Sequence, residues 1–466
     1  AYDVLVFDEA HELEARAIGK FEKSVSYDPV SRIAKRLEAL GESVCARNLT
    51  LQGMGFFNRL DAILNGRDRT LLANADKGPA LLANAAEFRI ALRTAWRRLK
   101  DESKLLEGRD AKLLETAARK AYDYAEVLKT LPESLGQDQP LHVHVAETQR
   151  IGAKLTQTPF RVAGLFKDRL FGNPEQLTVI CLSATLSMHK QAGVQWMTGP
   201  DGELVQVAEP LFKEFRQRVG LAECREFQCP SPFDYQRQCA VYLPRVPGQS
   251  GTRDKPNPYG NPNTAEWRGW AKDETKRLVD LSHGRALVLT TSAKACKDMG
   301  EHLGKFCHWP VRFQGEGLDN ARLVEWFKAT PNAVLVGTAS FWAGISVEGE
   351  ALSLVVIDRV PFDSHEDPLF KARDEWYKAR GKSSWVDLNL WPAITKLRQG
   401  MGRLIRTKSD TGVVAILDPR LLTKPAYKPI LRALPDCPQV RDLDDPRLAR
   451  LLGVEGGVQP LSLAHG

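Results

Sequence analysis

The stretch YDVLVFDEAH, at residues 2–11, decides the fold class of this chain. Its first six residues form a short apolar run rich in β-branched side chains, which is typical of a strand buried in a parallel sheet. The acidic residues of DEAH follow at once, at the carboxyl end of the predicted strand. Open α/β sheets bind their ligands at that end. The stretch therefore predicts an α/β fold with a ligand site beginning at residue 8.

The adjacent carboxylates of Asp8 and Glu9 are the groups that a nucleoside triphosphatase needs. One carboxylate holds Mg²⁺, usually through water, and the next can orient and deprotonate the attacking water. The alternative is an ordinary acidic helix N-terminus, where the helix dipole favours Asp and Glu. These four residues alone leave both interpretations open.

Two further motifs follow in the chain. Residues 182–186 (LSATL) come after a predicted strand at 177–182, and the hydroxyls of Ser183 and Thr185 can bridge a triphosphate site and a nucleic-acid site. The alternative for them is a Ser/Thr turn or helix N-cap. Residues 399–406 (QGMGRLIR) place two arginines three apart, which we expect on one helix face. Guanidinium groups suit phosphate oxygens and, supplied from a second domain, stabilise the charge that develops there. The alternative, a solubilising surface pair, is less compatible with the strand predicted at 413–417.

Between these motifs the secondary structure that the sequence predicts changes twice. From about residue 12 to 147 it is helical, and Phe88, Leu92, Trp96 and Leu99 recur at the spacing of a core-facing helix surface. Beside them run the arginines at 89, 93 and 97, which suit either a solvated face or a DNA-facing stripe. After residue 263, apolar strands at 286–289, 333–336, 352–357 and 413–417 alternate with helices. This alternation predicts a second parallel α/β unit.

Composition adds weaker constraints. The chain has 466 residues, enough for about three domains, and a net charge of +7, which favours a polyanionic partner only slightly. No apolar stretch approaches the roughly 18 residues needed to span a bilayer, and there is no signal peptide, so we expect no membrane association and a cytoplasmic location. The 8 cysteines include no CxxC pair, which disfavours a disulfide framework or a zinc ribbon.

Taken together, five segments resemble motifs II to VI of the DinG/XPD helicases of superfamily 2. They are 8–11 (DEAH), 182–186 (LSATL), 231–238 (SPFDYQRQ), 337–362 (GTASFWAGISVEGEALSLVVIDRVPF) and 399–420 (QGMGRLIRTKSDTGVVAILDPR). The resemblance implies an α/β fold of two RecA-like parallel-sheet domains, with a helical, Arch-like insertion in the first. The boundaries that we expect are 1–19 and 151–235 for the first RecA-like domain, 20–150 for the insertion, 236–440 for the second RecA-like domain and 441–466 for a C-terminal tail.

The resemblance also implies roles for individual residues. Asp8 would hold Mg²⁺ through water, Glu9 would be the catalytic carboxylate, and His11 would couple hydrolysis to movement. Ser183 and Thr185 would link the nucleotide and DNA sites. The residues that would reach the γ-phosphate are Gln399, Arg403 and Arg406. The residues that would contact DNA are Thr290, Thr291 and Ser292 of motif IV, Gly337, Thr338, Ser340 and Phe341 of motif V, and Arg89, Arg93 and Arg97 of the insertion.

The activity implied is ATP- and Mg²⁺-dependent movement from 5′ to 3′ on single-stranded DNA, with unwinding of tailed duplexes or R-loops. An RNA-guided CRISPR complex is a further candidate partner, because one branch of the family accompanies type IV CRISPR systems. Motif V usually reads FWEGVDVPGE in the family, whereas Ala343, Ser346 and Glu348 stand at three of its positions here. These changes leave an alternative open, a DNA-binding scaffold with an uncoupled motor. A nuclease–helicase fusion would need an exonuclease domain upstream.

The sequence starts at Ala1, without Met, and contains no G-x-x-x-x-G-K-[ST] phosphate-binding loop. We therefore expect it to be a piece of a longer protein whose upstream part carries that loop. The ligands of any iron–sulfur cluster would also lie upstream, because no four cysteines here have suitable spacing.

Overall fold

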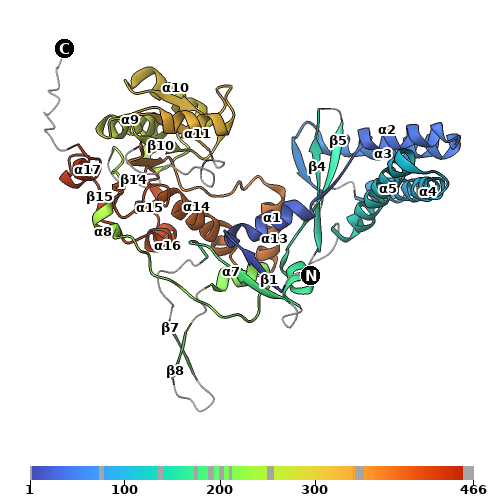
Figure 1. The fold of residues 1–466 in the computed structure, drawn as a ribbon, viewed down its shortest axis with the longest axis horizontal. Coiled ribbons are helices and arrows are strands. Elements are labelled where there is room, and N and C mark those ends of the chain that lie inside the picture. Colours follow the sequence, from blue (N-terminus) through green and yellow to red (C-terminus); the bar gives the residue numbers. More distant parts are fainter. Residues whose placement is uncertain are drawn as a thin grey trace. The chain divides into compact units, whose positions relative to one another are not determined.

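The computed structural model describes residues 3–72, 78–134, 140–150, 152–172, 177–186, 194–198, 204–208, 212–248, 257–338, 341 and 351–454. The chain divides into two units, each assembled from stretches that are distant in sequence (Figure 1). The first comprises Ala1–Ala184, Phe215–Cys224 and Ser364–Leu388, and the second comprises Thr185–Glu214, Arg225–Asp363 and Asn389–Gly466.

The second unit is built on a parallel sheet that has seven strands within the described residues, in the order β11-β12-β10-β13-β14-β9-β15. Every residue of the central strands is buried, as expected for a parallel sheet covered on both faces. The four strands predicted after residue 263 are therefore confirmed. The strand bounds are β9 Cys239–Tyr242, β10 Ala286–Leu289, β11 Val311–Phe313, β12 Val334–Gly337, β13 Leu354–Ile357, β14 Gly412–Ile416 and β15 Gln439–Val440.

Helices cover this sheet and begin at recognisable caps. The side chains of Thr264, Ser292 and Asp319 accept hydrogen bonds from the first turns of α9, α10 and α11. The larger helices are α9 Ala265–Leu281, α10 Ala293–Phe306, α11 Asn320–Ala329 and α14 Trp391–Met401. The short ones are α8 Tyr235–Gln238, η4 Pro258–Gly260, α15 Arg420–Thr423, η7 Pro425–Tyr427, α16 Lys428–Ala433 and α17 Pro446–Leu451.

Helix α17 belongs to the core of the second unit. Its Leu448 and Leu451 are buried in the same apolar cluster as the sheet, although the sequence analysis set 441–466 apart as a tail. The unit also contains an antiparallel hairpin of β7 Val194–Thr198 and β8 Leu204–Ala208.

In the first unit, β1 Val4–Phe7 pairs in parallel with β6 Thr178–Cys181. The predicted parallel strand is thus present, but the expectation that it is buried is wrong, because Val4 and Val6 are 51% and 52% exposed. The reason is that, within the described residues, these two strands form a sheet of their own and each has a single neighbour. After β1 come the 3-10 helix η1 Ala10–Glu12 and then α1 Leu13–Phe21.

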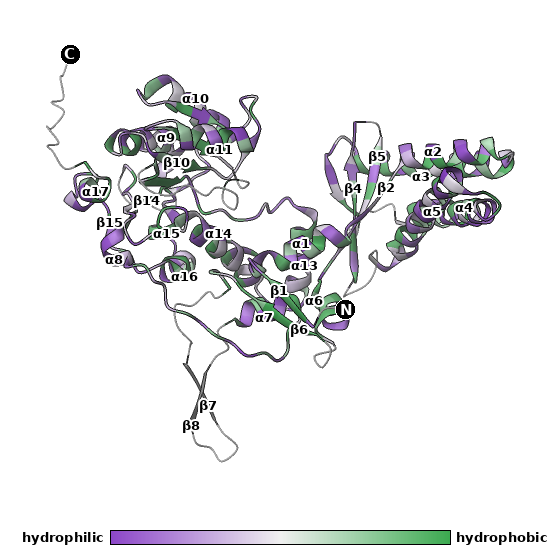
Figure 2. Cartoon of the chain, viewed as in Figure 1, coloured by the Kyte–Doolittle hydropathy of each residue, from purple (hydrophilic) through white to green (hydrophobic). Residues whose placement is uncertain are grey.

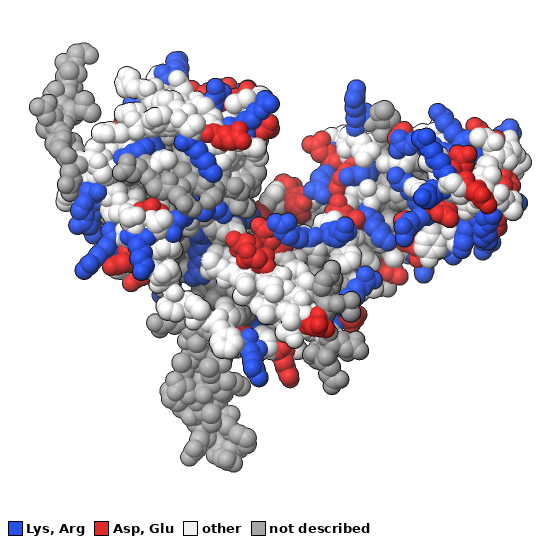
Figure 3. Space-filling view, in the orientation of Figure 1, with Lys and Arg blue, Asp and Glu red and all other residues white. Residues whose placement is uncertain are grey.

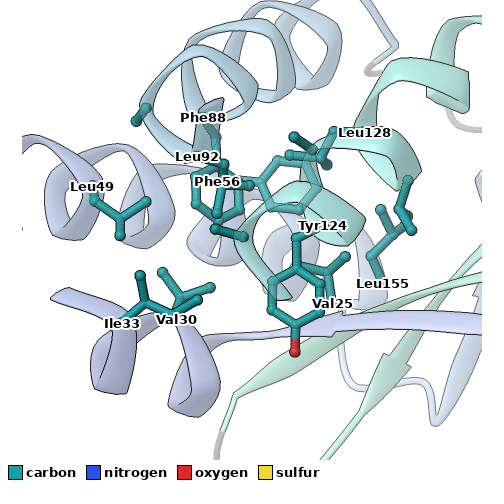
Figure 4. Packing of buried hydrophobic residues seen from close by; sticks show 14 of the residues in the cluster. Val25, Val30, Ile33, Leu49, Phe56, Phe88, Leu92, Tyr124, Leu128 and Leu155 are labelled. Atoms are coloured by element: carbon teal, nitrogen blue, oxygen red, sulfur yellow. The ribbon is translucent and has the colours of Figure 1, made fainter. Parts of the chain in front are cut away.

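The insertion combines helices with an antiparallel sheet, which the sequence analysis did not anticipate. Its helices are α2 Tyr27–Ala39, α3 Ser43–Leu64, α4 Gly78–Ser103 and α5 Gly108–Ser134. The sheet has four strands among the described residues, in the order β2-β5-β4-β3: β2 Lys23–Ser26, β3 Arg69–Leu71, β4 His142–Thr148 and β5 Ala153–Pro159. Apolar and polar residues are interspersed along the ribbons of these helices (Figure 2), and many of the apolar ones form a buried cluster. Phe56, Phe57 and Phe88 pack there with ring centroids 5.4 to 5.8 Å apart, and Leu92 lies beside them (Figure 4).

The remaining helices of the first unit are α6 Ala163–Phe166, a π-helical turn Lys167–Phe171, α7 Lys213–Val219 and α13 Pro368–Ala379. A second π-helical segment spans Trp385–Leu390. Among the helices in the described ranges, none combines the length and apolar character needed to cross a bilayer.

Candidate active site

The acidic pair of the DEAH stretch lies where β1 ends. Asp8 is exposed and its Oδ1 accepts a hydrogen bond of 2.9 Å from the backbone N–H of Glu9. Glu9 adopts a left-handed conformation, with φ of 50° and ψ of 43°, which few residues other than glycine and asparagine tolerate. Such strain is found mainly where the surrounding structure holds a functional group in place. Both carboxylates therefore face solvent at a sheet edge, instead of merely opening the helix that follows.

A hydrogen-bond chain joins this pair to the SATL stretch. The Nδ1 atom of His11 lies 2.7 Å from Ser183 Oγ and 3.2 Å from Glu9 Oε2, and Ser183 Oγ donates to Glu9 Oε2 over 3.3 Å. The backbone N–H of Ala10 also donates to Leu182 O at 2.9 Å. One proton arrangement satisfies the chain, with Nδ1–H of His11 donating to Ser183 and Ser183 donating to Glu9. The sequence-predicted residues Glu9 and His11 are thus brought together with Ser183, which lies 172 residues after His11 in the sequence.

The imidazole of His11 is 4% exposed. Burial lowers its pKa below the ordinary value, and the nearby carboxylates of Glu9 and Glu12 only partly oppose that effect. His11 is therefore neutral at physiological pH, so its 3.2 Å contact with Glu9 Oε2 brings a neutral ring, and not an imidazolium, beside the carboxylate. If the Glu9 carboxylate changes its hydrogen-bond partner, its contact with the neutral His11 ring changes as well.

The donors at this edge fit Mg²⁺. An exposed aspartate carboxylate at the end of a parallel strand supplies the hard oxygen that Mg²⁺ prefers, and its exposure leaves room for the waters that the ion keeps. Asp8 would hold the ion, which when bound would neutralise phosphate charge. Thr185 is buried, so its hydroxyl is not displayed at the surface as that of Ser183 is.

In the second unit, the predicted motif IV and V residues meet at the carboxyl ends of β10 and β12. From β10 the chain continues to β11 on one side, and from the neighbouring strand β13 it continues to β14 on the other. The carboxyl ends of β10 and β13 therefore form a topological switch point of the kind where α/β sheets bind ligands. The Thr290 hydroxyl is buried and donates to Gly337 O at 3.3 Å, while Ser292 caps α10. Thr291 and Ser292 are more exposed than Thr290, so they are better placed to meet a nucleic-acid backbone.

The start of motif V is fixed by a residue that the sequence analysis did not single out. Gln314 Oε1 accepts hydrogen bonds from both the N–H and the hydroxyl of Thr338, at 3.0 and 2.7 Å. Phe341 is 2% exposed and packs so closely on Gly337 that a Cβ there would lie 2.5 Å from its ring. The Phe341 side chain thus belongs to the core, and burial does not favour its predicted contact with DNA. Ser340 and the motif V departures Ala343, Ser346 and Glu348 lie outside the described residues.

Two buried aspartates at the ends of β13 and β14 were also missed. Asp358 is 3% exposed, and its Oδ1 accepts the N–H of Arg359 at 2.7 Å. Burial raises its pKa to about 6, although Arg359 and a backbone hydrogen bond from Thr291 oppose the rise. Asp418 pairs with Arg420, with Nη2 and Oδ2 2.7 Å apart. Their signal in the sequence is the acidic residue directly after each apolar strand, the same signal that identified Asp8.

The arginines of QGMGRLIR do not share a helix face, so that expectation is wrong. Helix α14 ends at Met401, and glycines at 400 and 402 disfavour its continuation. Arg403 lies in the turn that follows, where its N–H donates to Gly400 O at 3.2 Å. Arg406 lies in the next loop, where its N–H donates to Asp410 Oδ2 at 2.9 Å. Gln399 is in the last turn of α14, and all three predicted residues are partly exposed.

The arginine stripe on α4 is divided in two. Arg93 is held over the rings of Trp96 and Tyr122, 5.0 Å from each centroid, and lies 3.5 Å from the carboxylate of Glu126. Arg89 and Arg97 are exposed. Acidic and basic side chains are interspersed over these helices (Figure 3), which is the pattern of a solvated surface.

The sequence and the fold can now be set beside known proteins. Residues 275–437 match the helicase C-terminal domain family. The ATP-dependent DNA helicase YoaA of Escherichia coli K12 is 31% identical over 462 residues, which cover 97% of this chain and 65% of YoaA. The ATP-dependent helicase DinG of Mycobacterium tuberculosis is 40% identical over 160 residues, 34% of this chain and 24% of DinG. The structure of S. tokodaii Xpd4 aligns with a TM-score of 0.54 at 15% identity, over 94% of this chain and 75% of Xpd4.

These similarities agree with the paired carboxylates at the strand end and with the second parallel sheet, which are features of superfamily 2 helicases. The chain is similar in sequence to the DinG/YoaA-like ATP-dependent helicases, and similar in fold to the XPD helicases. The Xpd4 likeness confirms the α/β fold class with RecA-like domains. The chain spans 65% of the length of YoaA, the first of these relatives.

Proposed function

We propose that the protein carrying this chain is an ATP-dependent DNA helicase that moves 5′ to 3′ on single-stranded DNA and unwinds tailed duplexes or R-loops. The observation that carries the proposal is the chain from Glu9 through Ser183 to His11, which joins the acidic pair to a second motif in one network. YoaA and DinG, by name ATP-dependent helicases, support the class of activity.

In this proposal Glu9 accepts a proton from the attacking water, and Asp8 would hold Mg²⁺, which would neutralise phosphate charge. Protonation or reorientation of Glu9 weakens its hydrogen bond with Ser183. The neutral ring of His11 then changes its contacts with Ser183 and Glu9. Arg403 and Arg406 stabilise the charge that develops on the phosphate. DNA is bound mainly through its phosphates by the loops after β10 and β12, so binding is insensitive to sequence.

The test is steady-state ATP hydrolysis by the full-length protein, with and without single-stranded DNA. We expect Glu9→Gln to lower kcat by about a hundredfold or more, because it removes the general base but keeps a group that hydrogen-bonds Ser183. Glu12→Gln is the matched control, since Glu12 is the next acidic residue and pairs with Arg16 on the same turn.

Strand displacement separates the finer claims. Duplexes with a single 5′ or 3′ tail report direction, and an R-loop of the same sequence reports whether an RNA–DNA hybrid is a substrate. DNA binding without any hydrolysis by the unmodified protein would contradict the motor. It would favour the uncoupled scaffold, with Ala343, Ser346 and Glu348 as its explanation. Displacement only from the 3′ tail would overturn the direction.

A further inference from the structure

The segment SPFDYQRQ, residues 231–238, has no role in the activity described so far. Its last residue is Gln238, at the end of α8 and directly before β9. The side chain is 7% exposed, although glutamine is usually a surface residue. A buried amide persists where its polar atoms have partners, so those partners show what it holds.

The amide makes three hydrogen bonds, two to the loop that follows Arg406 and one within the 231–238 segment. The Nε2 group donates to the backbone carbonyls of Thr407 at 2.9 Å and Asp410 at 2.8 Å. The Oε1 atom accepts from the N–H of Asp234 at 2.9 Å. The amide therefore fastens the 231–238 segment to the loop that follows Arg406.

That loop has little regular structure of its own to hold Arg406. The Asp410 carboxylate stabilises this loop, because its Oδ2 accepts hydrogen bonds from the N–H groups of Arg406 and Thr407 at 2.9 and 2.8 Å. The N–H of Asp410 in turn donates to Thr407 Oγ1 at 3.2 Å. Gln238 binds the two carbonyls of the same turn, so it fixes the turn against the sheet.

We propose that Gln238 is a positioning residue for Arg406: through Thr407 and Asp410 it sets the place of the guanidinium that acts on the phosphate of ATP. The inference rests on the proposed function of Arg406. A transition-state group displaced by about 1 Å can lose on the order of a hundredfold in rate. Loss of this amide should therefore lower turnover more than it weakens ATP binding.

The experiment compares Gln238→Glu, Arg406→Ala and the double variant in the full-length protein, with kcat and KM for ATP measured in saturating single-stranded DNA. Glu has the size of Gln but turns an oxygen toward two carbonyl oxygens. We expect kcat to fall by about ten- to a hundredfold with a smaller change in KM. In the Arg406→Ala background the same substitution should change kcat by less than about twofold, because residues that act as a unit are not additive.

Two further variants separate positioning from stability. Asp410→Asn keeps one oxygen that can accept from the loop and should retain more activity than Asp410→Ala. Tyr242→Phe removes a buried 2.6 Å hydrogen bond to Glu274 at the other end of β9, so it destabilises the same strand without touching the loop. It should leave kcat near that of the unmodified protein. If Gln238→Glu does not fold, the Asp410 pair carries the test.

The outcomes are distinct. Equal losses from Gln238→Glu in both backgrounds would show a purely structural role and overturn the inference, while leaving Arg406 in place. Turnover unaffected by Arg406→Ala would overturn the proposed role of that arginine, and the inference with it. A loss that appears only when Arg406 is present supports the inference.

Discussion

At the scale of single residues, Asp358 shows how a buried carboxyl marks a strand end. It follows β13, accepts the N–H of Arg359, and sits beside the loop that carries Thr291. Burial raises its pKa to about 6 from an ordinary value of 3.8. A raised pKa means that the folded protein binds the proton more tightly than the unfolded chain does. Its contribution to stability is therefore complete below pH 3.8 and is lost as the pH rises through about 6.

We predict that Asp358→Asn removes this pH dependence. Relative to the unmodified protein, the variant should gain on the order of 3 kcal/mol in free energy of unfolding between pH 4 and pH 7, as the shift implies. Denaturant unfolding of both proteins across that range measures the difference. A difference that does not vary with pH would contradict the prediction.

The sequence predicted residues better when they belong to a pattern than when they act through partners. Asp8, Glu9, His11 and Ser183 stand in short motifs beside apolar strands. Gln314 and Gln238 do not, because nothing local shows that an amide will be buried and will meet loops far along the chain. The helix expected at Arg403 and Arg406 is absent for a local reason, because Gly400 and Gly402 favour the end of α14 at Met401.

At the scale of elements, the first unit contains a largely buried ion triad that joins three helices distant in sequence. Glu14 of α1 lies 2.6 Å from Arg218 of α7 and 3.0 Å from Arg373 of α13, and all three side chains are 14% exposed. Arg373 also donates to Phe160 O, at the end of β5. Burial acts to raise the pKa of Glu14, but the two arginines outweigh it and hold that pKa below its ordinary value.

We predict that Glu14→Gln destabilises the first unit by about 3 kcal/mol, because it removes the carboxylate that pairs with two largely buried guanidinium groups. Hydrogen exchange should rise most in α7 and α13. The matched control is Asp28→Asn, which breaks an exposed pair with Arg32 and should change stability by less than about 0.5 kcal/mol.

The pH dependence of the triad has the opposite sign to that of Asp358. A lowered pKa gives stability that is present above the ordinary value of 4.5 and is lost as the pH falls below it. Equal hydrogen-exchange rates in α13 of the unmodified protein and of the Glu14→Gln variant would contradict the role of the triad.

These elements also show where the sequence was insufficient. The strands of the second unit were recognisable because each is a continuous apolar run. The sheet of the insertion was not, because β4 (HVHVAET) and β5 (AKLTQTP) mix polar and apolar residues within a helical context. The placement of α13 with the first unit depends on Glu14 and Phe160, more than 200 residues away, and no local pattern records such a contact.

At the scale of the whole molecule, the net charge of +7 bears on the proposed binding of DNA. The excess is small, and on the insertion basic and acidic side chains alternate (Figure 3). Arg93 is already paired with Glu126 and stacked on two rings, and Arg98 lies 3.3 Å from Glu42. The structure thus favours a solvated face over a DNA-binding stripe on α4.

This preference yields a prediction for DNA binding by the full-length protein. Affinity for single-stranded DNA should fall with salt, and a double Arg89→Ala, Arg97→Ala variant should keep the same slope of log affinity against log salt. If the two arginines did neutralise DNA phosphates, their removal would flatten that slope by about 0.7 for each phosphate, a change that is readily measured.

Arg93→Ala should instead lower the stability of the insertion by about 1 kcal/mol, because it removes two cation–π interactions and an ion pair. A flatter slope in the double variant would restore the stripe as part of the DNA path. An unchanged slope would leave the loops after β10 and β12, at the carboxyl ends of strands in the second sheet, as the candidates for binding the DNA backbone.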